Sequence, residues 1–174
     1  AIIDQDAGEQ YLYPDMLLAR DLLNRSGIET VILGPQALSC KTGRLVGGGK
    51  VIDMVYNRLT DFNLSEPANA QLRAALMDDV AVVSPAPRHH KLYADKRNLI
   101  WLSDAARLEA WGVGERHRAA LAQIPATRPV TADAAEELWT GRRGYFFKPA
   151  AGFGSRATYR GDKLTKRVWA EILA

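Results

Sequence analysis

Hydrophobic and polar residues in the first part of the chain alternate between a strand-like and a helix-like pattern. The opening run "AIID" predicts a buried strand, and Met16, Ala19 and Leu23 follow at helical spacing, so we expect a helix over residues 11–26. The run "IETVILG" predicts the next strand. Strand, helix and strand within about 30 residues form a βαβ unit, which predicts a parallel sheet and an α/β fold.

The next region mixes turn residues with residues that favour strands. Residues 37–58 predict an extended hairpin that ends in the strand "VIDMVYNR". A helix is expected from Ser65 to about Met77, followed by the buried strand "VAVVS". "PAPRHH" predicts a loop, and one helix is expected over residues 91–111.

The sequence pattern changes in the last third of the chain. "IPATRPV" predicts a short strand, and Asp133 with Glu136 has the spacing of a capping pair for a helix over residues 134–139. "YFFKPA" predicts a strand that runs into a glycine-rich loop, with a return arm at "TYR" and a final helix. We place a domain boundary near residue 90, giving domains 1–90 and 91–174.

Composition is that of a soluble globular protein, with 47% hydrophobic and 25% charged residues in 174. No apolar run approaches the roughly 20 residues that span a bilayer, and no signal-peptide pattern opens the chain. The single cysteine suits a reducing compartment, so a cytoplasmic location is expected. Both ends break off inside predicted elements, which suggests part of a longer protein.

Positive charge is concentrated at the end of the chain. Residues 140–174 carry eight Lys and Arg against two carboxylates, although the whole chain has a net charge of only +3. A basic segment around a glycine loop indicates an anionic ligand. Nucleic acid would satisfy the charge as well, but the chain lacks a nucleic-acid motif and most of its aromatic residues lie on predicted core faces, so this partner is not favoured.

The glycine loop has three interpretations. "GFGSRA" matches the dinucleotide pattern G-x-G-x-x-A, but "TYRGDKL" follows it where that pattern requires a helix. An ordinary hairpin with exposed charges is the second. The third is a phosphate site: Lys148 ends a strand, Gly152 and Gly154 let backbone N–H groups approach an anion, and Ser155 and Arg156 add a hydroxyl and a charge. We favour the third, because it explains a lysine beside so apolar a run.

The order of several segments resembles a known family. "YADKRNLIWLSD", "IPATRPV", a helix and "YFFKPAAGFGSRATYRG" together resemble the beginning of an ATP-grasp domain. The preceding βαβ region resembles the Rossmann-like domain that comes before it in such proteins. Details such as "VIDMVYNRLTDF" are most similar to the circularly permuted, glutathionylspermidine synthetase-like group. The resemblance implies a Rossmann-like pre-ATP-grasp domain with a parallel sheet, then the first part of the ATP-grasp nucleotide-binding domain.

The same resemblance implies a function. Lys96 and Lys148 would contact the ATP phosphates, with Gly152, Gly154 and Ser155 in a flexible loop over them. The parent would be an ATP-dependent carboxylate–amine ligase that acts through an acylphosphate on small-molecule substrates. Its Mg²⁺ ligands would lie outside this sequence, so we assign no catalytic or metal-binding residue and expect this chain alone to be inactive. A non-catalytic ATP-grasp-like or basic nucleic-acid-binding module is the alternative.

Other polar residues allow smaller inferences. Asn57 and Arg58 lie at the carboxyl end of a predicted strand, where ligands bind in open α/β sheets. Arg58 could hold a substrate carboxylate or could form a surface salt bridge. Asp4 lies at a similar strand end and is more typical of a turn. The neighbouring His89 and His90 are expected to be solvated.

Overall fold

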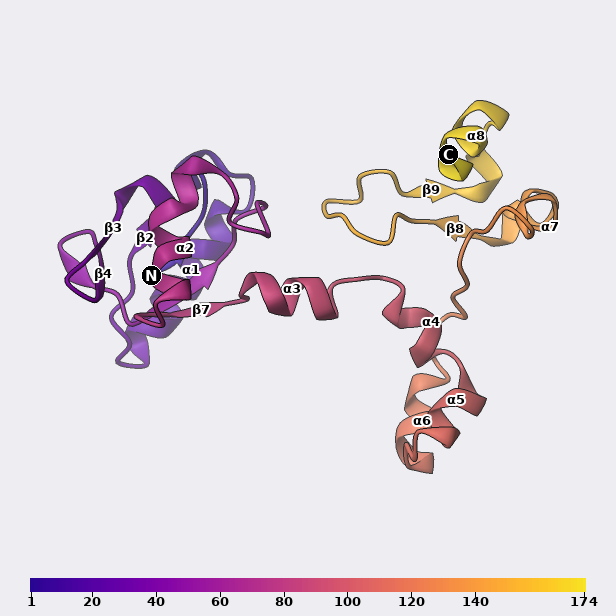
Figure 1. The fold of residues 1–174 in the computed structure, drawn as a ribbon, viewed down its shortest axis with the longest axis horizontal. Coiled ribbons are helices and arrows are strands. Elements are labelled where there is room, and N and C mark those ends of the chain that lie inside the picture. The colour runs from indigo at the N-terminus through magenta and orange to yellow at the C-terminus, as the bar shows by residue number, and fades with distance from the viewer. The chain divides into compact units, whose positions relative to one another are not determined.

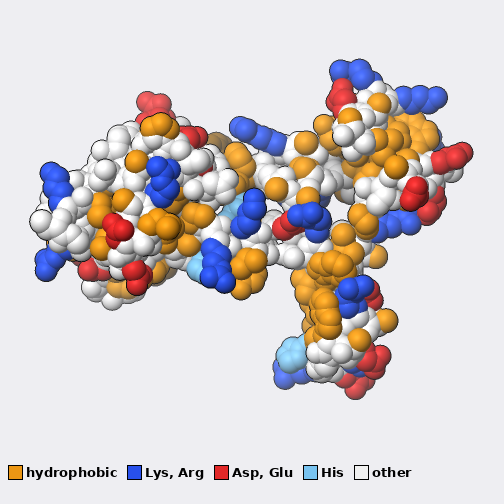
Figure 2. Space-filling model, in the orientation of Figure 1, with side chains coloured by type: hydrophobic (Ala, Val, Ile, Leu, Met, Phe, Trp, Pro, Cys, Tyr) orange, Lys and Arg blue, Asp and Glu red, His pale blue; other side chains and the backbone are white.

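The chain forms two units in the computed structural model, which describes residues 1–174. We call Ala1–Leu92 the N-terminal unit and Tyr93–Ala174 the C-terminal unit. Figure 1 shows the first in indigo to magenta and the second in magenta to yellow. Apolar side chains reach the surface of both units (Figure 2).

A four-stranded parallel sheet organises the N-terminal unit, in the strand order β2-β1-β6-β7. Its strands are β1 (Ile2–Ile3), β2 (Ile32–Leu33), β6 (Met54–Asn57) and β7 (Val82–Ser84). This sheet confirms the predicted α/β class. Because β2 and β6 lie on opposite sides of β1, the direction of the chain connections reverses between β1 and β6.

A helix packs against each face of this sheet because neighbouring strand residues point in opposite directions. Ile2 packs with Met16 of α1 (Tyr13–Arg25). Ile3 packs on the other face in the cluster that includes Leu72 of α2 (Ala70–Met77). A short 3₁₀ segment precedes α2, and Pro14 lies in the first turn of α1, where its missing N–H costs no hydrogen bond.

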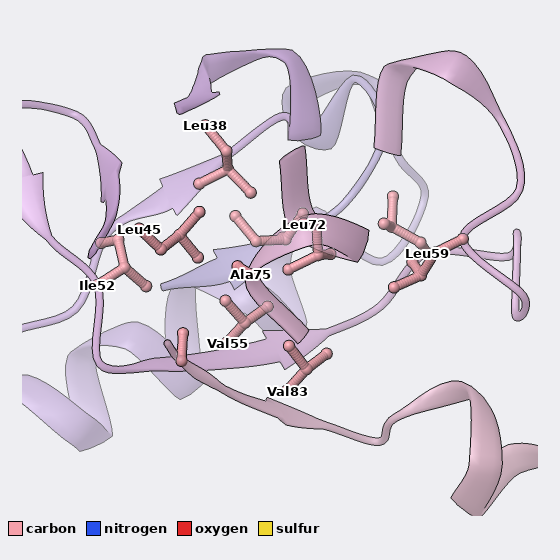
Figure 3. Close-up of a cluster of buried hydrophobic side chains, with 11 residues drawn as sticks. Leu38, Leu45, Ile52, Val55, Leu59, Leu72, Ala75 and Val83 are labelled. Carbon is pink, nitrogen blue, oxygen red and sulfur yellow. The ribbon is translucent and has the colours of Figure 1, made fainter. Parts of the chain in front are cut away.

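The main core lies between α2, the parallel sheet and a second, antiparallel sheet (Figure 3). This second sheet consists of β3 (Leu38–Lys41), β4 (Arg44–Gly47) and β5 (Lys50–Val51). The predicted hairpin is therefore confirmed, but its last expected strand is divided, since β6 leaves the hairpin and joins the parallel sheet. The side chains that meet in this core include Leu38, Leu45, Ile52, Val55, Leu72, Ala75 and Val83.

The region after β7 differs from the prediction. "PAPRHH" is not a loop, because Pro87 opens the helix α3 (Pro87–Tyr93) in a position that tolerates proline. The single helix expected over residues 91–111 is wrong as well. It is divided into the end of α3 and two short helices, α4 (Asn98–Leu102) and α5 (Ala105–Ala110).

A side-chain cap explains one of these breaks. Asp104 has an extended backbone and accepts a hydrogen bond from the Arg107 amide at 3.0 Å, which starts α5 as a new helix. The helix α6 (Glu115–Leu121) follows a turn at Gly112, whose φ of 75° favours glycine.

Two further expectations in the C-terminal unit are wrong. "IPATRPV" forms no strand, because its prolines cannot donate ladder hydrogen bonds. The helix α7 (Ala135–Thr140) begins without a side-chain cap, because Ala134 and not Asp133 occupies the capping position. The capping pair with Glu136 therefore does not form.

The hairpin and the final helix of the C-terminal unit are confirmed. β8 (Phe146–Phe147) pairs antiparallel with β9 (Tyr159–Arg160), and α8 (Lys166–Leu173) starts at Thr165, which accepts from the Val168 amide. The unit's core brings these elements together with α7 through the side chains of Leu138, Phe147, Leu164 and Trp169.

The base of the β8–β9 hairpin is tightly closed. The Gly161 amide donates to the Tyr145 carbonyl at 2.9 Å. A Cβ atom at Gly161 would lie 1.7 Å from the Arg142 carbonyl oxygen, so a side chain does not fit. No helix in either unit has the combined length and apolar character needed to cross a bilayer.

We predict that Asp61→Asn destabilises the N-terminal unit in a pH-dependent way. Burial favours the neutral acid, but hydrogen bonds from the Glu66 amide, the Asn69 side chain and Ser65 prevail and lower the pKa of Asp61 to about 2. The ionised carboxylate therefore stabilises the fold above about pH 4 and stops doing so as the pH falls toward 2. Urea denaturation at pH 7 should show a loss of about 1 kcal/mol in the free energy of unfolding.

The matched control is Asp21→Asn, whose carboxylate contacts only Arg20 on the surface of α1. It should leave the free energy of unfolding within about 0.5 kcal/mol of wild type. If Asp61→Asn kept the wild-type dependence of stability between pH 4 and pH 2, Asp61 would not be the group responsible.

Candidate functional site

Side-chain alternation along β8 separates a core face from an exposed face. Phe147 is only 5% exposed and packs in the core, whereas Phe146 is 65% exposed. Arg160 lies opposite Phe146 in the antiparallel pair and so shares its face. Lys148 follows two residues after Phe146, so it continues this exposed face, and its side chain reaches solvent.

The loop between β8 and β9 has an unusual backbone. Gly152 and Gly154 have positive φ angles of 136° and 60°, and so do Ser155 at 57° and Ala157 at 52°. Residues with a Cβ are strained in this conformation by about 1 kcal/mol or more, and such strain clusters at ligand-binding loops.

Several N–H groups of this loop are available to a ligand. Within the loop the Arg156 amide donates to Phe153 and the Thr158 amide donates to Ser155, both at 3.2 Å. The amides of Gly154, Ser155 and Ala157 donate no hydrogen bond within the protein. Exposed N–H groups in a loop with left-handed residues form a concave surface that suits an anion.

Lys96 makes direct contact with this loop, although 56 residues separate it from Gly152. Its backbone amide donates to the Ala150 carbonyl at 2.9 Å, and its Nζ donates to the Gly152 carbonyl at 3.2 Å. An ammonium group has three hydrogens, so one bond to Gly152 leaves two for a ligand. The structure therefore brings Lys96 and the glycine loop together in one unit.

The charge of this site is positive. The loop residues from Pro149 to Thr158 include no carboxylate, and Arg156 stacks over the Phe153 ring at 4.9 Å. The acid nearest to the loop along the chain, Asp162, pairs with Arg160 at 2.6 Å, and Asp95, next to Lys96, pairs with Arg97 at 2.5 Å. No carboxylate lies within ion-pair distance of Lys148.

A hollow of about 300 Å³ lies on the exposed side of β8. It is lined by Arg143, Gly144, Tyr145, Phe146, Arg160 and Asp162. Phe146 and Arg143 are not among the residues that the sequence predicts to face a ligand. The alternation around Phe147 was the signal that could have identified Phe146.

Asn57 and Arg58, the residues predicted to bind a substrate in the N-terminal unit, both make polar contacts within that unit. Asn57 is buried, donates to the Pro85 carbonyl at 3.1 Å and accepts from the Leu59 amide at 3.1 Å, so both ends of its amide support the fold. Arg58 donates from Nη1 to Asp15 at 2.9 Å. The salt-bridge interpretation of Arg58 is thus observed, with a partner on α1.

The histidines and acids form no metal centre. His90 lies in α3 and stacks on Phe62, with ring centroids 3.6 Å apart. No group of three or more His, Cys, Asp or Glu side chains is arranged to hold a metal ion. Comparison with known proteins gave no match, either to a family model or to a curated protein.

We predict that Lys96→Ala loosens the glycine loop and leaves the fold unchanged. The substitution removes the bond from Nζ to Gly152 but keeps the backbone bond to Ala150. One such bond contributes about 0.5–1.5 kcal/mol, so amide hydrogen exchange of residues 150–158 should become roughly two- to tenfold faster. The exposed Lys163→Ala is the control. Equal exchange in both variants would show that Lys96 does not hold the loop.

Proposed function

We propose that the C-terminal unit binds ATP by its phosphate groups, as part of an ATP-dependent carboxylate–amine ligase of the ATP-grasp type. The observation that carries this proposal is the contact between Lys96 and Gly152. This contact brings Lys96 and the glycine loop together, although the sequence predicted them from two separate motifs. A cation from one segment and backbone donors from the other then face the same anion.

Each group has a distinct role in this proposal. Lys148 supplies a point charge at the end of β8, and Lys96 supplies its two remaining hydrogens. The N–H groups of Gly154 and Ser155 face the phosphate oxygens, and Arg156 adds charge at the tip of the loop. The exposed ring of Phe146 offers a flat apolar surface for the base.

The reaction we propose is acyl activation. The γ-phosphoryl group of ATP passes to a substrate carboxylate, which gives an acylphosphate and ADP, and an amine then displaces phosphate to form an amide. The lysines and loop amides orient the phosphates and offset their charge. ATP reacts as its Mg²⁺ complex in such chemistry, but no group of acidic residues in this chain suits that ion, so we assign no step to it.

The folds of both units agree with this proposal at a coarse level. The parallel sheet of the N-terminal unit suits a Rossmann-like domain, and the reversal between β1 and β6 is where such sheets bind ligands. In the C-terminal unit the glycine loop leads into β9 and not into a helix, which argues against a dinucleotide site at "GFGSRA".

We predict that Lys148→Ala weakens Mg-ATP binding by at least tenfold, which corresponds to about 1.4 kcal/mol. The lysine is exposed and lies outside the core, so the fold should persist, as circular dichroism would show. Isothermal titration calorimetry of the chain with Mg-ATP is the measurement. Lys166→Ala, an exposed cation at the start of α8, is the matched control and should retain wild-type affinity.

Two further titrations separate this proposal from its competitors. NADH should not bind, whereas saturable NADH binding would favour a dinucleotide site. A single-stranded oligonucleotide should bind more weakly than Mg-ATP. If it bound tightly and lost affinity steeply with log[salt], the basic surface would be a nucleic-acid site. Absence of Mg-ATP binding by the folded chain would refute the ligase proposal.

A further inference from the structure

We propose that the N-terminal unit pairs with a second copy of this chain through α1 and the part of the parallel sheet beside it. In this pairing the two α1 helices run antiparallel, and each lies over the sheet of the other copy. The contact joins two N-terminal units, so it does not depend on ATP binding by the C-terminal unit.

On the α1 side, a helix packs on only half of the parallel sheet. Met16 of α1 packs with Ile2 of β1, and Ile32 of β2 packs against them. Tyr56 pairs with Ile2 and therefore shares its face, and so do the neighbours of Tyr56 at alternate positions. None of these β6 and β7 residues belongs to a buried cluster, and each is at least 38% exposed: Met54, Tyr56 and Val82.

This uncovered strip has the width of one helix. Neighbouring strands lie about 4.8 Å apart, so two strand spacings match the roughly 8–10 Å between the axes of packed helices. A helix laid beside α1, which covers β1 and β2, would therefore lie over β6 and β7. The other helix of the sheet, α2, packs on the opposite face through Leu72, so this place is open to a helix from another molecule.

The flank of α1 beside this strip has a regular exposed pattern, which we call the α1 stripe. Asp15, Leu18, Leu22 and Arg25 follow one another at spacings of three, four and three residues, so they lie along one line of the helix. Leu18 and Leu22 are 71% and 58% exposed. Asp15 accepts from Arg58, the residue after β6, at 2.9 Å, so the α1 stripe lies on the β6 side of the helix.

The α1 stripe is complementary to itself when two copies run antiparallel. Its spacing is that of the a and d positions of a coiled coil, and it reads the same from either end. Reversal brings Leu18 opposite Leu22 of the second copy and Asp15 opposite Arg25 of the second copy. A two-fold axis repeats each contact, which gives two leucine pairs and two ion pairs. A parallel pair would instead bring like charges together.

The charged groups of α1 are available for this contact. Asp15 uses Oδ2 for Arg58, whereas its Oδ1 accepts no hydrogen bond within the protein. Arg25 is exposed and forms no ion pair within the chain. Asp21, beside the α1 stripe, is paired with Arg20 at 2.8 Å, so its charge is balanced and does not repel a second copy.

The size of the patch sets the expected affinity. The α1 stripe and the uncovered strip together contribute fewer side chains than the roughly 20–30 residues that a standard interface has on each side. We therefore expect a weak dimer, with a dissociation constant on the order of 10 to 100 μM.

Sedimentation velocity of the full chain, from about 1 μM to about 1 mM, tests the proposal. The sedimentation coefficient should rise with concentration, from that of one chain toward that of two. Leu18→Glu and Leu22→Lys each place a charge against a leucine, so each should weaken association at least tenfold. Both side chains are exposed, so both variants should keep the fold, as circular dichroism would show.

A mixture of the two variants tests the antiparallel arrangement. In an equimolar mixture the introduced carboxylate faces the introduced ammonium group, and the remaining two leucines face each other, so association should return. A parallel pair would bring neither set together. A mixture that associates no better than the separate variants would overturn the proposal.

Two further variants complete the test. Val82→Glu, on the uncovered strip, should weaken association by about two- to tenfold. Met77→Glu is the matched control, because Met77 is an exposed apolar residue at the end of α2, and it should associate like wild type. A chain that stays monomeric at every concentration would overturn the proposal, and so would wild-type association in Leu18→Glu or Val82→Glu.

Discussion

The alternation of side chains along a β-strand is the constraint on which both units depend. In β1 it directs Ile2 toward α1 and Ile3 toward α2, so a helix packs against each face of this strand. In β8 the same alternation buries Phe147 and exposes Phe146 and Lys148. Because Phe147 is buried, its neighbours Phe146 and Lys148 point to solvent, so the core of this unit determines where the glycine-loop site lies.

The glycine loop and the edge of the parallel sheet differ in charge. The glycine loop combines lysines with unpaired backbone donors, and the carboxylate of Asp95, next to Lys96, is paired with Arg97, so the loop attracts an anion from a distance. At the edge of the parallel sheet, the two carboxylates of Asp4 and Asp15 flank the single guanidinium of Arg58, so the charge there is negative.

Sequence patterns could predict the elements whose signals are local. The βαβ unit and the β8–β9 hairpin follow from apolar runs and turn residues that lie close together in the chain. The helix at Pro87 was missed because proline and histidine suggest a loop unless the first turn of a helix is considered. The contact of Arg58 with Asp15 joins residues 43 positions apart, and no periodicity indicates such a partner. Lys96 was associated with the loop only through the order of motifs.

The close approach at Gly161 has a consequence for how this region can vary in sequence. Any side chain there would collide with the Arg142 carbonyl, whereas a Cβ atom at Gly154 would meet nothing within 4 Å. The base of the hairpin is thus fixed to glycine by a close contact, while at the tip only the positive φ angle of Gly154 favours glycine. Homologous chains should keep a glycine at the base even where the tip has diverged to accept a different anion.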